Sequence, residues 1–304
     1  MNMGILCILC AALLNSFCYI FSARFLLKHK SPLRMLLIVQ VLMMVMSLPP
    51  LPFLYPFGAI ERILPLAGLV AVWVLVFFIG QGCFFRAQNH FEASRLASLL
   101  GLKIIVLAVL YISLEHKNLG LFQWLAVLVA AGAGMLFNWS GSSRTNPIGW
   151  LFLATTLVCY STADITETRL VLMTQQTGLS LMRSALGATF LLYGVLGLTA
   201  LPFFVWFKPT LPQVRDAFPY ALFWLASQIL LLAGFAAVKP VFGNVVLALR
   251  GVFSVLMGLL LARVGLGALD SRDIPRRKWI QRGVAALLMI LTIALYSGAF
   301  GGGN

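Results

Sequence analysis

Residues 65–86 have the sequence PLAGLVAVWVLVFFIGQGCFFR, a run of 22 residues in which Arg86, at the end, is the one charged side chain. A membrane-spanning helix needs roughly 20 mostly apolar residues to cross about 30 Å of hydrocarbon. Within lipid, only helices and closed barrels can hydrogen-bond all of their backbone polar groups. Because the apolar residues here are continuous and do not alternate with polar ones, the stretch predicts a membrane-spanning helix.

The same pattern extends along the whole chain of 304 residues, of which 61% are hydrophobic and only 10% charged. A soluble domain of this length needs far more charge on its surface. We therefore expect an all-α integral membrane protein with ten transmembrane helices. The predicted segments are 4–27, 34–54, 65–86, 92–113, 119–139, 147–170, 180–206, 217–238, 241–263 and 279–299.

Short sequence markers recur at the ends of corresponding segments in the two halves of the chain. The second segment is introduced by SPLR at residues 31–34, and the seventh by SLMR at residues 180–183. LPF closes the second segment at residues 51–53 and is expected to close the seventh at residues 201–203. Further residues match at a constant offset of 151, namely Trp73 and Trp224, Phe84 and Phe235, Phe91 and Phe242, and Ala97 and Ala248.

These matches predict two repeats of five helices each, residues 1–140 and residues 147–304. Because five is an odd number, the second repeat enters the membrane from the opposite side, and the two repeats are inverted. Inverted repeats place a shared binding site near the bilayer midplane, where it can open alternately to either side. The repeat therefore favours a transporter.

The end of the first half is similar to the repeat unit of a known family. A segment rich in small residues, Ala93 to Ser113, is followed by Leu114-Glu115, then by QWL at residues 123–125 and by the Gly-rich stretch 130–134. In this order the residues resemble the EamA-like branch of the drug/metabolite transporter (DMT) superfamily. The second half departs from that pattern at the basic loop 270–278. The resemblance implies ten spans, both termini in the cytoplasm and transport of small organic solutes.

Two basic residues lie deep inside predicted segments that correspond to each other in the repeat. They are Lys103, in segment 92–113, and Arg250, in segment 241–263. An ionisable residue at such a depth costs roughly 2.5–3.5 kcal/mol to insert and usually faces the bundle interior. We expect the two cations to bind a carboxylate or phosphate of the substrate, Arg as a fork and Lys as a point charge. The alternative is that they pair with acidic residues and only fix helix packing.

Asp164 and Glu167 are the acidic residues expected to lie closest to these cations. They are three residues apart and so share one face of the sixth helix, with Tyr160 one turn earlier as a further substrate-binding residue. A carboxyl group shielded from water takes up a proton more readily than an exposed one, so both acids are candidates for proton coupling. We expect both to lie nearer a helix end than Lys103 does. Glu167 has the alternative interpretation of a solvated charge beside Arg169.

Gln81 and Gln228 lie within the third and eighth segments and are expected to line the substrate cavity. The alternative for such residues is an interhelical hydrogen bond worth about 1 kcal/mol. For Trp73 and Trp224 we expect packing or anchoring at the membrane interface.

Gly194 and Gly197 are small residues of the seventh segment. Small residues allow two membrane helices to approach closely. The contact is expected either within one protomer or between two protomers, so a homodimer is possible.

Other kinds of chemistry lack their sequence signals. No GxxxxGK[ST] loop is present to bind ATP phosphates, which argues against a primary pump. His29, His90 and His116 fall in separate loops or segment ends, so we expect no metal site, and we expect no cofactor. The five cysteines all lie in predicted segments, so a disulfide framework is not expected.

The net charge of +14 comes from 22 Lys and Arg against 8 Asp and Glu, and most basic residues lie in short loops. That placement is typical of membrane orientation and lipid contact and argues against nucleic-acid binding. The odd-numbered loops carry fifteen basic residues and the even-numbered loops five. The positive-inside rule then puts the odd loops in the cytoplasm and both termini outside, against the family resemblance. Because the bias is large, we favour the orientation that it predicts.

The leading hypothesis is a secondary transporter, not an enzyme, that moves a small anionic or zwitterionic organic solute such as an amino acid or metabolite across the cell inner membrane. The solute would bind near Lys103 and Arg250 by alternating access. A flippase for lipid-linked phosphates is an alternative, because central cations suit a phosphate as well as a carboxylate. A third alternative, an intramembrane enzyme, needs a convergent nucleophile and base, for which Asp164 with His90 is the least implausible start.

Overall fold

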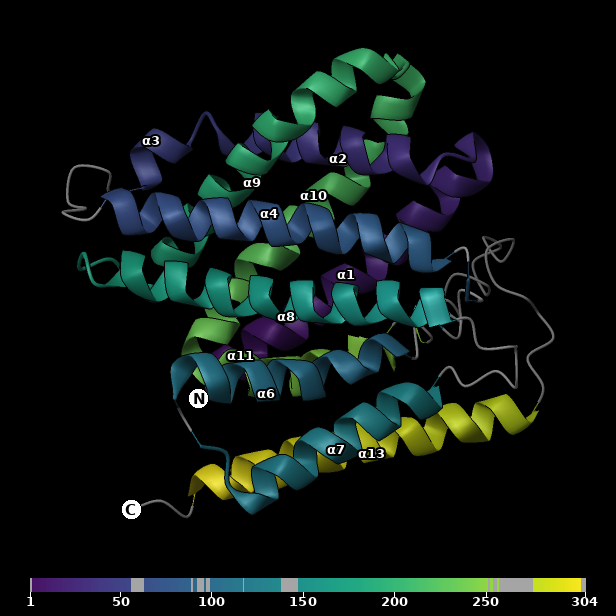
Figure 1. Ribbon diagram of the computed structural model, residues 1–304, viewed down its shortest axis with the longest axis vertical. Coiled ribbons are helices and arrows are strands. Elements are labelled where there is room, and N and C mark those ends of the chain that lie inside the picture. The colour runs from purple at the N-terminus through teal and green to yellow at the C-terminus, as the bar shows by residue number, and fades with distance from the viewer. Residues whose placement is uncertain are drawn as a thin grey trace. The chain divides into compact units, whose positions relative to one another are not determined.

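The regular structure of the chain is helical, in agreement with the all-α prediction, throughout the part that the computed structural model describes. That part comprises residues 2–55, 63–88, 90–91, 96, 99–116, 118–137, 147–250, 252–253, 256 and 276–301. The elements, all labelled in Figure 1 except the 3₁₀ turn η2, are α1 (Asn2–His29), α2 (Pro32–Ser47), α3 (Leu51–Leu54), α4 (Ile63–Gln88), η2 (Leu100–Leu102), α6 (Lys103–Glu115), α7 (Leu121–Phe137), α8 (Pro147–Gln175), α9 (Leu181–Phe207), α10 (Leu211–Val238), α11 (Pro240–Leu247) and α13 (Arg276–Gly301).

By length and composition, five helices in the described residues can cross a membrane. These are Met3–His29, Pro65–Ala87, Pro147–Gln175, Leu181–Phe207 and Leu211–Val238. Shorter apolar helices are Pro32–Ser47, Leu121–Leu136 and Ile280–Tyr296. The count of ten membrane-spanning helices stays a prediction.

The chain divides into two compact units, each assembled from separate parts of the sequence. Unit 1 contains Met1–Val74, Glu167–Val238 and Phe253–Arg272, and unit 2 contains Leu75–Thr166, Lys239–Val252 and Asp273–Asn304. The boundary between the units falls inside α4 and inside α8. Both units draw residues from both predicted repeats, and the repeat boundaries at 1–140 and 147–304 stay a prediction.

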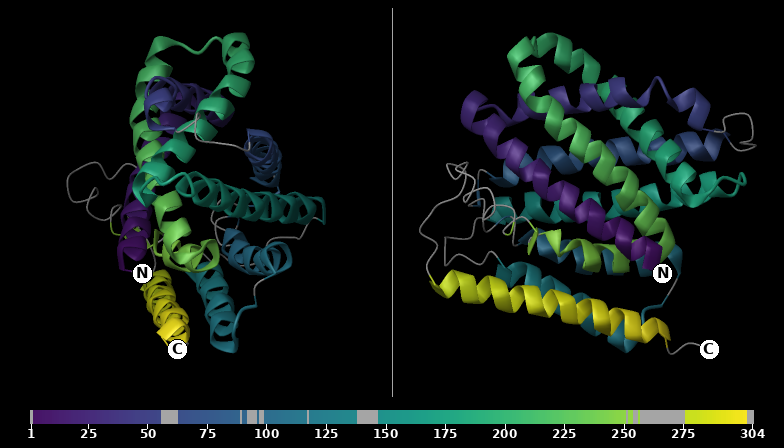
Figure 2. Two further views of the ribbon diagram at one scale, coloured as in Figure 1. Left: turned by 90° about the vertical axis from the view of Figure 1, so that its left-hand side faces the viewer. Right: turned by 180° about the vertical axis from the view of Figure 1, so that it is seen from behind.

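In unit 1, α1 runs alongside α10, as Figure 2 shows. The close approach depends on two glycines, Gly4 on α1 and Gly234 on α10. A Cβ atom at Gly234 would collide with the side chain of Ile8 and lie 3.0 Å from the carbonyl oxygen of Gly4. Small residues at this seam let the two backbones pack closely, as is typical of membrane helices.

The other main seam of unit 1 joins α2 to α9. Gly197 lies against Met44, and a Cβ atom there would come within 2.6 Å of the carbonyl oxygen of Gln40. One turn earlier, Gly194 lies against Leu48. Both glycines are therefore used for packing within one protomer, which is one of the two roles expected for them.

In unit 2, α7 and α13 lie side by side (Figure 1), and the turn η2 packs on α7. Gly101 of η2 approaches Gly134 so closely that an added Cβ atom would lie 3.2 Å from its Cα. An apolar cluster of the same unit contains Ala87, Phe91, Leu96, Leu99, Leu153 and Leu157.

Prolines end one predicted segment early but do not end another. α2 ends at Ser47, and Pro49 and Pro50 follow in a turn before the short helix α3, because adjacent prolines remove backbone donors and clash with the preceding turn. The seventh segment, predicted to end at residue 206, ends at Phe207, and Pro202 lies inside the helix near that end. A single proline is tolerated in a membrane helix where neighbouring groups satisfy the freed carbonyl.

Candidate solute-binding and proton-coupling residues

Helix α6 begins at Lys103, well inside the predicted segment 92–113. The 3₁₀ turn η2 directly precedes it, and the backbone N–H of Lys103 donates to the carbonyl of Leu100. A stretch of 3₁₀ geometry inside a longer helical segment often marks a functional position. Lys103 therefore lies at such an interruption inside its segment, and the expectation that the acids lie nearer the end of their span than Lys103 stays a prediction.

The segment that contains Arg250 is interrupted as well. Helix α11 ends at Leu247, and a turn at Ala248 and Leu249 separates it from Arg250. In this turn the N–H of Leu249 donates to the carbonyl of Val246 at 3.1 Å, three residues back. Interrupted helices at corresponding places in two repeats are a pointer to the binding site of secondary transporters.

A buried polar cluster of unit 2, here called the Lys103 cluster, consists of Lys103, Asp164 and Asn244 from α6, α8 and α11. Lys103 Nζ lies 2.7 Å from Asp164 Oδ2 and donates to Oδ1 at 2.9 Å. Asn244 Nδ2 donates to Asp164 Oδ2 at 2.7 Å and to the carbonyl of Pro240 at 2.9 Å. The side chains of Lys103 and Asp164 are only 19% and 9% exposed. Three helices thus converge on one carboxylate.

The ion pair bears directly on the role expected for Lys103. Pairing with an acidic residue is the alternative that the sequence left open, and the structure shows that Lys103 has such a partner in Asp164. A buried pair of this kind is stable only while each charge has its partner or an equivalent ligand. A role in solute binding stays a prediction, and it has to include Asp164.

The other residues predicted for the solute site are distributed over both units. In unit 2, Tyr160 lies one turn before Asp164 on α8, and its ring approaches Gly80 of α4 so closely that a Cβ atom there would lie 2.9 Å from Cε1. Gln81 and Arg250 are half-buried residues of unit 2. The third polar candidate, Gln228, is buried in α10 of unit 1. The substrate-binding roles of all four stay predictions.

A second cluster, here called the Glu167 cluster, lies in unit 1 and consists of one carboxylate and aromatic side chains. Trp73 Nε1 donates to Glu167 Oε1 at 3.0 Å. The Trp73 ring meets the ring of Tyr193 edge-on, with centroids 5.5 Å apart, and the Tyr193 hydroxyl accepts from Trp224 Nε1 at 3.1 Å. Tyr220 stacks on Trp224 with centroids 5.7 Å apart.

Burial decides between the interpretations given to these residues. Glu167 is only 7% exposed, so the interpretation of a solvated charge beside Arg169 is wrong. Trp73 is fully buried, so packing and not interfacial anchoring is its role. Its hydrogen bond to the carboxylate is a contact that the sequence did not reveal.

Sequence reasoning did not select two further members of these clusters, Asn244 and Tyr193. Each is a polar side chain inside a long apolar segment, and that position is the signal that could have found it. The hydrogen bond from Asn244 to Asp164 joins residues that are 80 positions apart in the chain.

Comparison with known families gives a match for the first half of the chain. Residues 2–140 match the model of the EamA-like transporter family. This stretch belongs to the EamA-like transporters. The family is part of the DMT superfamily, so the resemblance drawn from the end of the first repeat is confirmed. With its apolar helices, the chain is a multi-pass membrane protein, and the EamA-like family points to a membrane transporter of the DMT type.

A comparison with curated proteins found no match. One solved crystal structure of a protein is similar over 97% of this chain and 96% of its own length, with a TM-score of 0.62 and 13% sequence identity. At that identity the similarity shows a shared fold alone.

Proposed function

We propose that this EamA-like protein is a secondary transporter of a small zwitterionic organic solute, such as an amino acid, which it moves across the cell inner membrane by alternating access. The observation that carries the proposal is the buried pair of Lys103 and Asp164 at 2.7 Å. The pair offers a cation and an anion side by side, in a segment that is interrupted at the cation.

The chemistry of the pair favours a zwitterion over a simple anion. An anionic solute that bound Lys103 would compete with Asp164 for the ammonium group, and separating a buried ion pair is unfavourable. A zwitterion brings both charges at once, so its carboxylate can bind Lys103 while its ammonium group binds Asp164. Asn244 can continue to donate to Asp164 during this exchange, because its amide already does so at 2.7 Å.

The interrupted helices provide further ligands. The turns beside Lys103 and Arg250 break the regular pattern of backbone hydrogen bonds, and backbone groups freed in this way bind polar groups of substrates in other secondary transporters. Arg250 adds a second cation in unit 2 for an anionic side group of the solute.

Proton coupling is assigned to Glu167. The Trp73 indole, a neutral donor, hydrogen-bonds the Glu167 carboxylate, and the Glu167 side chain is buried. Burial penalises the charged form of a carboxyl group, so such a residue can take up and release a proton during transport. Asp164 is engaged with Lys103 and is assigned to the solute instead.

The test measures solute binding to the purified full-length protein in detergent, by thermal shift against neutral amino acids, dicarboxylates and organic amines. A solute at 100 times its Kd stabilises the folded state by about 2.7 kcal/mol. We expect stabilisation by one zwitterionic class, and we expect the neutral double variant Lys103→Gln/Asp164→Asn to lose it.

The matched control is the exposed ion pair of Lys28 and Asp216, which has the same distance of 2.7 Å. The double variant Lys28→Gln/Asp216→Asn should keep the stabilisation. Binding that survives in Lys103→Gln/Asp164→Asn would show that the pair is structural, and stabilisation by amines alone would move the solute site away from Lys103.

A further inference from the structure

Two helix connections meet at one end of unit 1. The first joins α1 to α2 through Lys30 and Ser31, and the second joins α9 to α10 through residues 208–210. At the end of α1, Lys28 Nζ and His29 Nε2 lie 2.7 and 2.8 Å from Asp216 Oδ2 near the start of α10. The end of α1 therefore contacts the start of α10, and the two connections lie close together.

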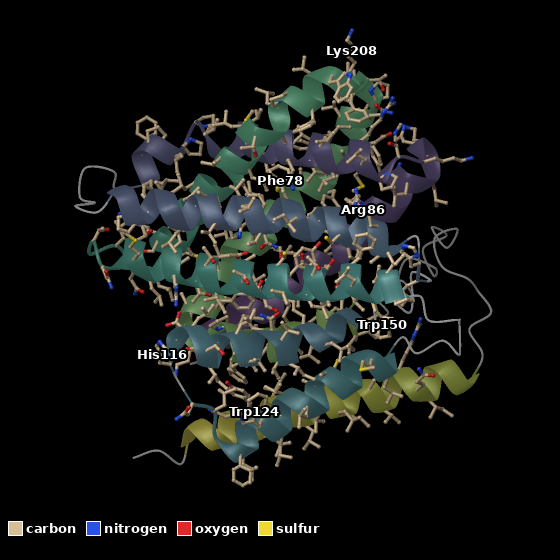
Figure 3. All side chains as sticks on the ribbon, in the orientation of Figure 1. Phe78, Arg86, His116, Trp124, Trp150 and Lys208 are labelled. Atoms are coloured by element: carbon tan, nitrogen blue, oxygen red, sulfur yellow. The ribbon has the colours of Figure 1, made fainter. Side chains whose placement is uncertain are left out.

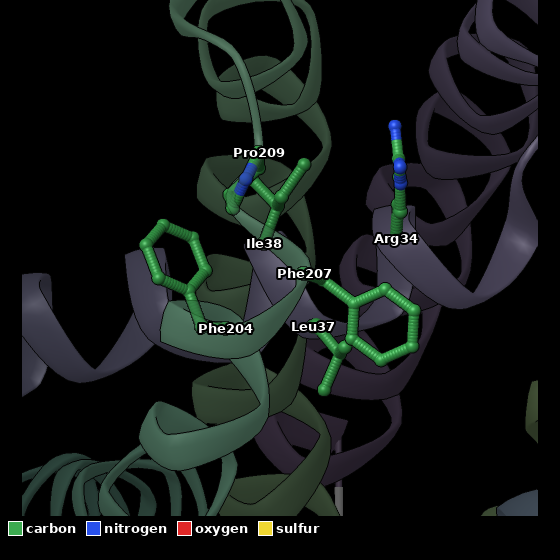
Figure 4. Close-up of a pocket in the computed structure, with 6 residues that line it drawn as sticks. All are labelled: Arg34, Leu37, Ile38, Phe204, Phe207 and Pro209. Carbon is green, nitrogen blue, oxygen red and sulfur yellow. The ribbon is translucent and has the colours of Figure 1, made fainter.

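A shallow groove lies between the start of α2 and the end of α9 at this same end (Figure 4). It is a surface depression and not an enclosed cavity. One charged residue and five apolar residues line it, namely Arg34, Leu37, Ile38, Phe204, Phe207 and Pro209. An apolar groove with one guanidinium group beside it suits a ligand that has a hydrocarbon part and an anionic part.

The surroundings of the groove are strongly basic. Residues 24–34 and 208–216 contain one acidic residue, Asp216, which is already in contact with Lys28 and His29. Lys208 lies between the groove residues Phe207 and Pro209, and its exposed side chain projects outward (Figure 3). The basic residues of these two stretches are Arg24, Lys28, Lys30, Arg34, Lys208 and Arg215.

Exposed apolar residues lie beside the groove. Trp206, next to the groove residue Phe207, is 77% exposed, and Val205 and Leu211 are exposed as well. Tryptophan at the end of a membrane helix is typical of the interface between hydrocarbon and water. Basic side chains at that depth attract anionic lipids.

We propose that this groove, which we call the Arg34 groove, binds an anionic phospholipid of the bilayer. The phosphate binds between Arg34 and Lys208, Arg34 as a forked donor, and the upper part of one acyl chain packs on Phe204 and Phe207. A phosphatidylcholine head group carries a quaternary ammonium that the surrounding cations repel. Free phosphate gains nothing from the apolar lining. The site is separate from the Lys103 cluster and does not depend on the transported solute.

The test is the apparent Kd of the full-length protein for dioleoyl phosphatidylglycerol in neutral detergent, measured by native mass spectrometry, with dioleoyl phosphatidylcholine and inorganic phosphate as probes for comparison. Each basic residue near an anionic membrane surface contributes about 1 kcal/mol, which is about fivefold in Kd. We expect Arg34→Gln/Lys208→Gln to weaken phosphatidylglycerol binding about 25-fold, and Phe204→Ser to weaken it with no change of charge.

The matched control is Arg183→Gln. Arg183 holds the position in α9 that Arg34 holds in α2, three residues after the serine that precedes each helix, but it lies at the opposite end of α9 from the groove. It should leave the Kd unchanged. Equal affinity for the two phospholipids, an unchanged Kd in Arg34→Gln/Lys208→Gln, or competition by inorganic phosphate as effective as that by the lipid would each overturn the proposal.

Discussion

Two ion pairs with the same closest distance of 2.7 Å differ in their surroundings. The Lys103 and Asp164 side chains are 19% and 9% exposed, whereas those of Lys28 and Asp216 are 60% and 28% exposed. Removing one partner of a buried pair leaves an uncompensated charge and costs about 3–5 kcal/mol. An exposed pair contributes only about 0–1 kcal/mol. The two pairs therefore predict unequal effects from the same substitution.

We expect Lys103→Ala to lower the free energy of unfolding by about 3–5 kcal/mol and Lys28→Ala by at most about 1 kcal/mol. Denaturant titration in detergent, followed by circular dichroism, measures both. The double variant Lys103→Leu/Asp164→Leu should regain most of the loss, because it removes both charges. Equal effects of the two single substitutions would contradict the burial of the Lys103 cluster.

The prediction for Glu167 is that it couples solute transport to the movement of protons. Glu167→Gln keeps an oxygen that can accept from Trp73 Nε1 but removes the group that titrates. In proteoliposomes, uptake driven by a pH gradient should be lost while exchange of solute across the membrane continues. Trp73→Phe is the companion variant, because it keeps the carboxyl group and removes its donor. Gradient-driven uptake at the original rate in Glu167→Gln would exclude this residue from coupling.

The sequence selected the charged members of the clusters but not their pairing. Lys103 and Asp164 were identifiable because an ionisable residue inside an apolar segment is expensive to insert. Their contact depends on how α6 and α8 are rotated about their axes, and residues 61 positions apart carry no local signal of that. Asn244 was not selected because an amide in such a segment equally suits a simple interhelical hydrogen bond.

At the scale of the helices, the sequence predicted the apolar segments well and their ends less well. α8 continues to Gln175, past the predicted end at residue 170, and α10 begins at Leu211, before the predicted start at residue 217. Hydrophobicity locates the part of a helix that lies in hydrocarbon, whereas a helix ends where its backbone bonds end. The interruptions at Lys103 and Arg250 leave the apolar pattern unchanged, so hydrophobicity did not predict them.

Packing of α2 on α9 gives a prediction at this scale. Alanine in place of glycine normally stabilises a helix interior by about 0.5–1 kcal/mol. At Gly197 the added Cβ atom meets Met44 and comes within 2.6 Å of the Gln40 carbonyl oxygen, so we expect Gly197→Ala to destabilise by about 1–3 kcal/mol instead. Gly68→Ala, where nothing lies within 4 Å, is the control in the same unit. A lower melting temperature for Gly68→Ala than for Gly197→Ala would refute the close seam.

At the scale of the whole molecule, one helix contact occurs twice. In unit 1, Gly234 of α10 faces Ile8 of α1, and in unit 2, Gly80 of α4 faces Cys159 of α8. Ile8 and Cys159 are separated by 151 positions, the offset at which the two halves of the sequence match. A glycine of the third or eighth segment thus packs on corresponding residues of the first or sixth. The two glycines, Gly80 and Gly234, are 154 positions apart, three more than the offset, so the two contacts are similar but not in strict register, and the repeat stays a prediction.

Orientation is the property of the whole molecule on which the basic residues and the family resemblance disagree. Lys208 lies in an odd-numbered loop, and fifteen basic residues in such loops against five in the even ones predict that it faces the cytoplasm. Anionic lipid in the cytoplasmic leaflet would then be available to the Arg34 groove. Gln176, exposed in the even-numbered loop after α8, should face the outside.

Single-cysteine labelling separates the two topologies. In a background with the native cysteines replaced by alanine, Gln176→Cys should react with a membrane-impermeant maleimide in intact cells. Lys208→Cys should react only after the membrane is permeabilised. The opposite pattern would place both termini inside, because an even number of spans keeps them on one side. It would also show that the basic loops face away from the cytoplasm, against the positive-inside rule.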